Sequence, residues 1–148
     1  MDTKTLNELK QAIRNSSLTT KIYIGCDSKR NSKGSVKYAT VVVLHINGKN
    51  GGQLFSFITN EQEYNKPQSP KMRLLNEAYK AVEIATQIID DIGDRHFELH
   101  LDLNTNPKHK SNLAVKEALG FVLGSLGINA KLKPHAFAAS CAADKLAG

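Results

Sequence analysis

The hydrophobic pattern of the chain changes from a strand-like to a helix-like period after residue 59, which limits the folds open to it. Residues 20–26 alternate between the two faces of a half-buried β-strand. Residues 36–46, which are rich in β-branched residues, and residues 53–59 are predicted as two further strands. The run NGKNGG between the second and third segments is a strong turn signal, so an antiparallel meander is predicted. Over residues 71–92, apolar residues instead recur every three or four positions, which is typical of an amphipathic helix.

The segments around this core predict further helices and strands in alternation. Strands are expected over residues 97–104 and 128–134, and helices over 3–15, 112–127 and 136–148. This order predicts the α/β class: a mixed five-stranded sheet, with a three-strand antiparallel meander and two parallel strands, flanked by helices. The 148 residues contain no internal repeat or linker. We therefore expect a single domain over 1–148, in which 1–18 form an extra N-terminal helical extension.

Composition narrows the functional classes without choosing among them. The formal net charge of +6 favours a polyanionic partner, although many basic proteins bind no nucleic acid. No apolar run approaches the roughly 20 residues of a membrane span, and the N-terminus lacks a signal-peptide pattern. Cys26 and Cys141 are too isolated for a zinc motif or a disulfide framework. A cytoplasmic protein with reduced thiols and no membrane partner is expected, while the oligomeric state stays open.

Four acidic residues are predicted to gather at one edge of the sheet. Asp27 and Asp102 each end a predicted strand, and right-handed crossovers bring the carboxyl ends of parallel strands to the same edge. Glu77, near the start of the long helix, falls at the margin of its buried stripe, whereas Glu83 points away. Asp144 lies among alanines of the last predicted helix. Each acid alone could be a turn former or a surface charge, but their convergence favours a functional site.

Clustered carboxylates require either protonation or a compensating cation. Like charges a few ångströms apart repel, so such a cluster is either partly protonated or occupied by divalent ions. Oxygen ligands suit hard ions such as Mg²⁺ or Mn²⁺. Two such ions about 3.5–4 Å apart can activate water and stabilise the leaving oxygen of a phosphodiester.

Basic residues surround the predicted position of the acids and fit a phosphate-bearing substrate. The predicted nucleic-acid contacts are Lys29, Arg30, Lys108, Lys110, Ser111 and Lys133. Lysines and helix N-termini both favour phosphate, and Ser111 is a plausible N-cap. A set of ordinary solvated lysines stays open as the alternative.

The acids, in this order of elements, resemble those of the ribonuclease H fold, with separations of 50, 25 and 42 residues. The runs YIGCDSK, ATVVVLH, LHLDLN, KHKSN and KPHAFAASCAADKLAG are similar to the YkuK family of predicted ribonuclease H-related nucleases, over roughly residues 20–148. The resemblance implies that Asp27, Glu77, Asp102 and Asp144 ligate two Mg²⁺ or Mn²⁺ ions, with Asp27 as the bridge. It also implies that His135 assists proton transfer or product release, unless it is a loop residue that contacts phosphate or solvent.

The expected function is therefore that of a divalent-metal-dependent nuclease. The resemblance implies in-line attack by water that leaves a 3′-hydroxyl and a 5′-phosphate, on the RNA of an RNA–DNA hybrid or on branched DNA. A proofreading exonuclease is disfavoured, because its Asp-x-Glu motif is replaced here by Asp27, Ser28 and Lys29. A helix that began at residue 136 would place Asp144 about 12 Å along its axis, so this ligand depends on where the helix starts. A catalytically inactive nucleic-acid-binding or scaffold module stays open as the alternative.

Overall fold

Four strands and three helices make up the part of the chain that the structure describes. The computed structural model describes residues 2–31, 34–46, 52–62, 69–101 and 112–132. In chain order the elements are α1 (Thr3–Asn15), β1 (Lys21–Arg30), β2 (Ser35–His45), β3 (Gly52–Gln62), α2 (Pro70–Ile92), β4 (His96–His100) and α3 (Asn112–Leu126). The N-terminal helix and the long central helix begin and end within a residue of their predicted bounds.

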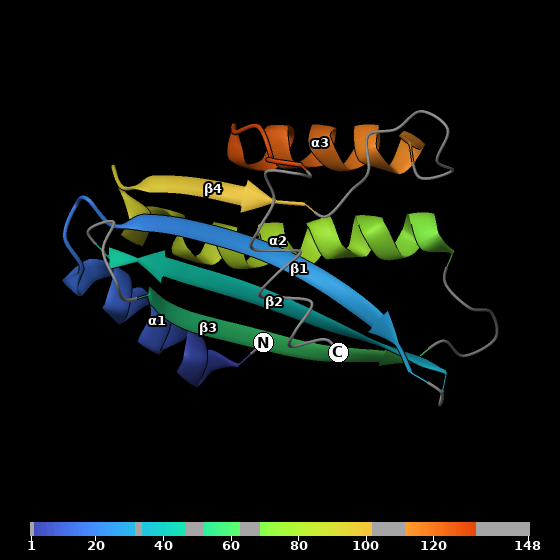
Figure 1. Cartoon of the computed structure of the whole chain (residues 1–148), viewed down its shortest axis with the longest axis horizontal. Coiled ribbons are helices and arrows are strands. Elements are labelled where there is room, and N and C mark those ends of the chain that lie inside the picture. Colours follow the sequence, from blue (N-terminus) through green and yellow to red (C-terminus); the bar gives the residue numbers. More distant parts are fainter. Residues whose placement is uncertain (1, 32–33, 47–51, 63–68, 102–111, 133–148) are drawn as a thin grey trace.

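The strands form one mixed sheet in the order β3-β2-β1-β4 (Figure 1). β1, β2 and β3 pair as an antiparallel meander, and β4 pairs parallel to β1. This arrangement confirms the α/β class, the meander and the parallel position of the fourth strand. β1 and β4 both run toward the end of the molecule at which α2 begins, as predicted (Figure 1). β4 stops at His100, opposite Gly25, before the end of β1.

The prediction of five strands is wrong, because the described part of the predicted fifth strand is reduced to one bridge. Lys131 donates its N–H to the carbonyl of Leu99 at 2.8 Å and accepts from the N–H of Leu101 at 2.9 Å. β4 ends at His100, so the residues on either side of Lys131 do not continue the pairing as a strand. Ala130 and Leu132 instead pack against the core. The last predicted helix, over residues 136–148, lies outside the described residues.

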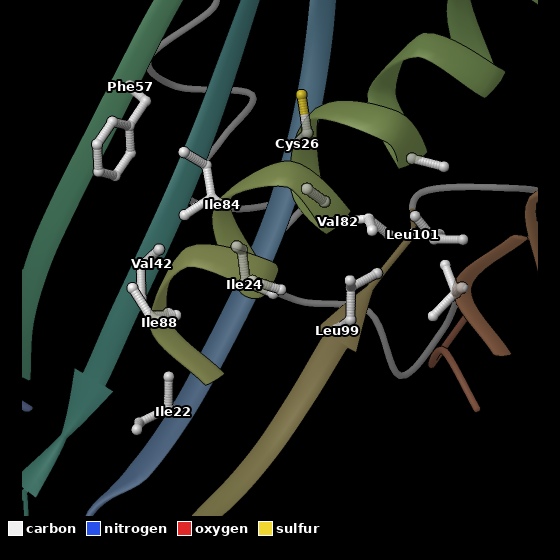
Figure 2. Close-up of a cluster of buried hydrophobic side chains, with 14 of the residues drawn as sticks. Ile22, Ile24, Cys26, Val42, Phe57, Val82, Ile84, Ile88, Leu99 and Leu101 are labelled. Atoms are coloured by element: carbon white, nitrogen blue, oxygen red, sulfur yellow. The ribbon is translucent and has the colours of Figure 1, made fainter. Parts of the chain in front are cut away.

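The core lies between one face of the sheet and α2 (Figure 2). Strand alternation directs Ile22, Ile24 and Cys26 of β1 toward α2, where each is at most 1% exposed. α1 and α3 pack on opposite flanks of α2 (Figure 1). Cys26 is a buried free thiol, whereas Cys141 lies outside the described residues. Among the described helices, none has both the length and the apolar character of a membrane span.

α2 is fixed at both ends by local signals. The Ser69 side chain accepts a hydrogen bond from the N–H of Met72 as the N-cap, and Gly93 ends the helix with φ of 55°. Ile88 is fully buried, but its neighbour Ile89, predicted in the same apolar stripe, is 38% exposed. The difference arises because Ile89 lies at the margin of the stripe, about 100° around the helix from Ile88.

These adjacent isoleucines make a matched test of the packing. We expect Ile88→Ala to lower the free energy of unfolding by about 3 kcal/mol, because it leaves a cavity beneath α2. Ile89→Ala removes the same atoms from a partly exposed position and is expected to lower it by less than about 1 kcal/mol. Urea denaturation followed by circular dichroism measures both values. Equal losses in the two variants would contradict the packing of α2 on the sheet.

Candidate active site

β1 continues through Asp27, so the prediction that the strand ends there is wrong. Asp27 lies opposite Ala39, and pairing with β2 continues to Arg30, which lies opposite Val36. Lys29 and Arg30 are therefore exposed residues of the strand and do not belong to a loop after it. The long antiparallel partner explains the extension, because β2 supplies backbone hydrogen bonds beyond the apolar stretch of β1.

Glu77 is a buried acid that contacts β1 directly. Only 5% of the residue is exposed, and the Ser28 hydroxyl donates a hydrogen bond of 2.5 Å to Glu77 Oε2. Burial raises the pKa of Glu77 to about 8, and the nearby charge of Asp27 acts in the same direction. The hydrogen bond from Ser28 and the guanidinium of Arg73 oppose that increase in pKa. Burial therefore favours the protonated form of Glu77.

Arg73 joins Ser28 to the first turn of α2. Its Nε lies 3.4 Å from Ser28 Oγ, and its Nη2 lies 3.4 Å from the Ser28 carbonyl oxygen. Arg73 precedes Glu77 by four residues, so both side chains leave the same side of the helix. Neither Arg73 nor Ser28 is among the site residues predicted from the sequence. Strand alternation was the available signal, because Ser28 shares the parity of the buried Ile24.

The two described acids approach β1 from opposite sides. Ser28 faces α2 and Glu77, so alternation places Asp27 on the other face of the sheet, where it is half-buried. The Ser28 N–H donates to Asp27 Oδ1 at 2.9 Å. Asp27 and Glu77 are thus brought to the same stretch of β1, and their charges interact, but they do not share one face. Strand parity, which the sequence interpretation did not apply to Asp27, accounts for this difference.

The face that carries Asp27 also carries paired like charges. Lys29 lies directly opposite Lys37 of β2. Like charges directly across an antiparallel pair are unfavourable in the absence of a counter-charge. The pair therefore suits a bound polyanion beside Asp27.

The strand that leads to Asp102 is anchored on both faces. Leu99 and Leu101 are buried in the core, whereas His100 is fully buried on the opposite side of β4. His100 Nε2 lies 3.1 Å from Glu98 Oε1, and burial lowers the pKa of His100. Leu101 is the last described residue before Asp102 in the chain.

Several predicted site residues fall outside the described part of the chain. They are Asp102, Lys108, Lys110, Ser111, Lys133, His135 and Asp144. Within the described ranges, no group of three or more His, Cys, Asp or Glu side chains is placed to hold a metal ion. The structure thus brings Asp27 and Glu77 to the predicted edge and leaves their proposed partners as predictions.

The described donors fit a hard divalent cation. The Glu77 carboxyl is nearly inaccessible, and burial disfavours its charged form. Such a group takes up either a proton or a cation, and its oxygen chemistry suits Mg²⁺ or Mn²⁺. Asp27 supplies a second carboxylate within electrostatic range.

Comparison with known proteins identifies the family. A family model described as Ribonuclease H-like, which is that of the YkuK family, matches residues 4–147. Comparison with curated proteins and with solved structures finds no significant match. The family match covers nearly the whole chain and agrees with the α/β class and the mixed sheet. The chain therefore belongs to the ribonuclease H-like family.

Proposed function

We propose that this protein is a divalent-metal-dependent nuclease that hydrolyses phosphodiester bonds by a two-metal mechanism. Its substrate would be the RNA of an RNA–DNA hybrid or branched DNA. Asp27, Glu77, Asp102 and Asp144 would hold the Mg²⁺ or Mn²⁺ ions, and His135 would assist the chemistry. The observation that carries the proposal is the buried carboxyl of Glu77, which contacts β1 at Ser28, the residue after Asp27, in a ribonuclease H-like chain.

Burial of Glu77 is hard to explain by stability alone. A carboxyl that is 5% exposed loses its hydration, and one hydroxyl donor and a neighbouring guanidinium compensate only part of that loss. A further carboxylate nearby makes the position less favourable still. Ionisable residues whose pKa is strongly shifted by burial and by nearby charges cluster at functional sites. The burial of Glu77 therefore supports a functional site at this position.

Each described residue has a distinct part in the proposed reaction. Asp27 and Glu77 would supply carboxylate ligands for the metal ions. When bound, these ions would activate water and stabilise the charge that develops on the phosphate. Lys29 and Lys37 would hold the substrate backbone on the face that carries Asp27. Arg73 would restrain the strand beside Glu77 through Ser28.

Cleavage of defined substrates tests the proposal. RNA–DNA hybrid, single-stranded, duplex and four-way-junction substrates are incubated with the protein in Mg²⁺, in Mn²⁺ or in EDTA. We expect cleavage of the hybrid or the junction in either metal and none in EDTA, with products that carry a 5′-phosphate. Binding of these substrates without cleavage in any metal would contradict the nuclease and support the inactive binding module.

The salt dependence of binding tests the Lys29–Lys37 pair. Replacing Lys29 with alanine is expected to weaken binding of all substrates similarly, because phosphate contacts carry no sequence information. It should also reduce the slope of log K against log salt by about 1. Lys10 on α1, an element that carries none of the proposed site residues, provides the control Lys10→Ala. Fluorescence anisotropy over a salt series measures both slopes, and equal slopes for the two variants would exclude a phosphate contact at Lys29.

A further inference from the structure

Among the described residues, the Ser28 side chain donates a hydrogen bond to the carboxyl of Glu77. Its Oγ lies 2.5 Å from Glu77 Oε2, and the residue is 7% exposed. Because Ser28 belongs to β1 and Glu77 to α2, this bond joins the two elements that carry the described acids. Ser28 is also the residue directly after Asp27, and its N–H donates to the Asp27 carboxylate.

We propose that Ser28 is the positioning residue of the metal site, and that its hydroxyl and N–H orient the carboxyl groups of Glu77 and Asp27 toward the metal ions. The inference rests on the proposed function. Ser28 is not assigned to touch the substrate or the metal. It acts through the two acids, as groups that hydrogen-bond to metal ligands generally do.

The geometry distinguishes this role from ordinary core packing. A serine that only filled space between β1 and α2 could be replaced by alanine with little consequence beyond a small loss of stability. Ser28 instead places one donor on each acid, from its side chain and from its backbone. Arg73 further restrains it, with Nη2 at 3.4 Å from the Ser28 carbonyl oxygen. The orientation of Ser28 is therefore fixed before any metal binds.

The chain offers a matched control for the hydroxyl. Ser35 on β2 is 4% exposed and hydrogen-bonds with the side chain of Asn31 and not with either acid. Ser35→Ala therefore removes a buried serine hydroxyl near the same end of the sheet without changing the contacts of Glu77. Ser28→Thr keeps a hydroxyl at the proposed position, whereas Ser28→Ala removes it.

The test measures Mn²⁺ binding by calorimetry, with the metal alone, in the wild type and in Ser28→Ala, Ser28→Thr and Ser35→Ala. We expect Ser28→Ala to weaken Mn²⁺ binding about tenfold, because hydrogen-bond partners of metal ligands typically contribute that much or more. Ser28→Thr is expected to restore most of the affinity, and Ser35→Ala to bind as the wild type does. In cleavage assays, Ser28→Ala should lower kcat and leave KM for the nucleic acid unchanged, because Ser28 does not touch the substrate.

The outcomes separate this inference from the proposed function. Wild-type affinity in Ser28→Ala, or equal weakening in Ser28→Ala and Ser28→Thr, would overturn the positioning role and leave the nuclease proposal standing. A wild type that neither binds Mn²⁺ nor cleaves nucleic acid would overturn both. Denaturation of each variant shows whether it is folded, and the threonine variant keeps the test decisive if the alanine variant unfolds.

Discussion

Asp27→Asn is expected to reduce the rate of nucleic-acid cleavage by about a thousandfold. Metal ions supply several kcal/mol of transition-state stabilisation, and each 1.36 kcal/mol corresponds to a factor of ten in rate. Asparagine has nearly the shape of aspartate, so pairing with Ala39 and the acceptor for the Ser28 N–H are retained. The charge that would bind the metal is lost. The fold should therefore persist while the activity disappears.

The measurement is single-turnover cleavage of the best substrate at saturating protein. Asp90→Asn on the exposed side of α2 makes the same chemical change away from the site and is expected to cleave as the wild type does. Denaturation curves of both variants should overlay that of the wild type. For Asp90→Asn, at an exposed position, the free energy of unfolding should lie within about 0.5 kcal/mol of the wild-type value. Residual activity above a tenth of the wild-type rate in Asp27→Asn would contradict a metal ligand at this position.

The contribution of Glu77 to the stability of the metal-free protein is expected to fall as the pH rises from 4.5 to about 8. Glu77 has a folded-state pKa raised from 4.5 to about 8, chiefly by burial. Between these values the folded state keeps its proton while the unfolded state releases it, so rising pH favours unfolding. The contribution of Glu77 is complete below pH 4.5 and is lost as the pH passes the folded-state pKa. The full change corresponds to on the order of 5 kcal/mol.

Glu77→Gln isolates this effect, because glutamine stays neutral and its carbonyl oxygen can still accept from Ser28. Urea denaturation in EDTA from pH 4.5 to 9 should show a flatter pH profile for this variant than for the wild type. Glu83→Gln on the exposed side of α2 should keep the wild-type profile. Adding Mn²⁺ at pH 8 is expected to stabilise the wild type and not Glu77→Gln, because only a carboxylate can exchange its proton for the metal. Parallel profiles for the wild type and Glu77→Gln would contradict a protonated Glu77.

Periodicity predicted the central elements well, because their burial is one-sided. The stripe of α2 faces the sheet, and alternation in β1 separates Ile22 and Ile24 from Tyr23. The burial of Glu77 followed from its place beside that stripe, and the exposure of Glu83 followed from the opposite side of the helix.

Partner-dependent features could not be predicted in this way. β1 extends to Arg30 because β2 pairs with it, and the polar residues at its end carry no apolar signal of their own. The bridge at Lys131 depends on where β4 ends, which is a property of a different segment. The Ser28 hydroxyl contacts Glu77 only because α2 packs against β1 and brings the two residues together. The local sequence pattern cannot predict these contacts, because they form between residues far apart in the chain.

Binding of Mn²⁺ tests most directly the claim that Asp27 and Glu77 hold the ions that cleavage requires. Calorimetric titration at pH 8 compares the wild type with Asp27→Asn and Glu77→Gln, with Asp90→Asn and Glu83→Gln as controls. We expect the wild type and both controls to bind Mn²⁺, and each site variant to bind at least about tenfold more weakly. Wild-type affinity in both Asp27→Asn and Glu77→Gln would contradict the metal site and, with it, the proposed mechanism.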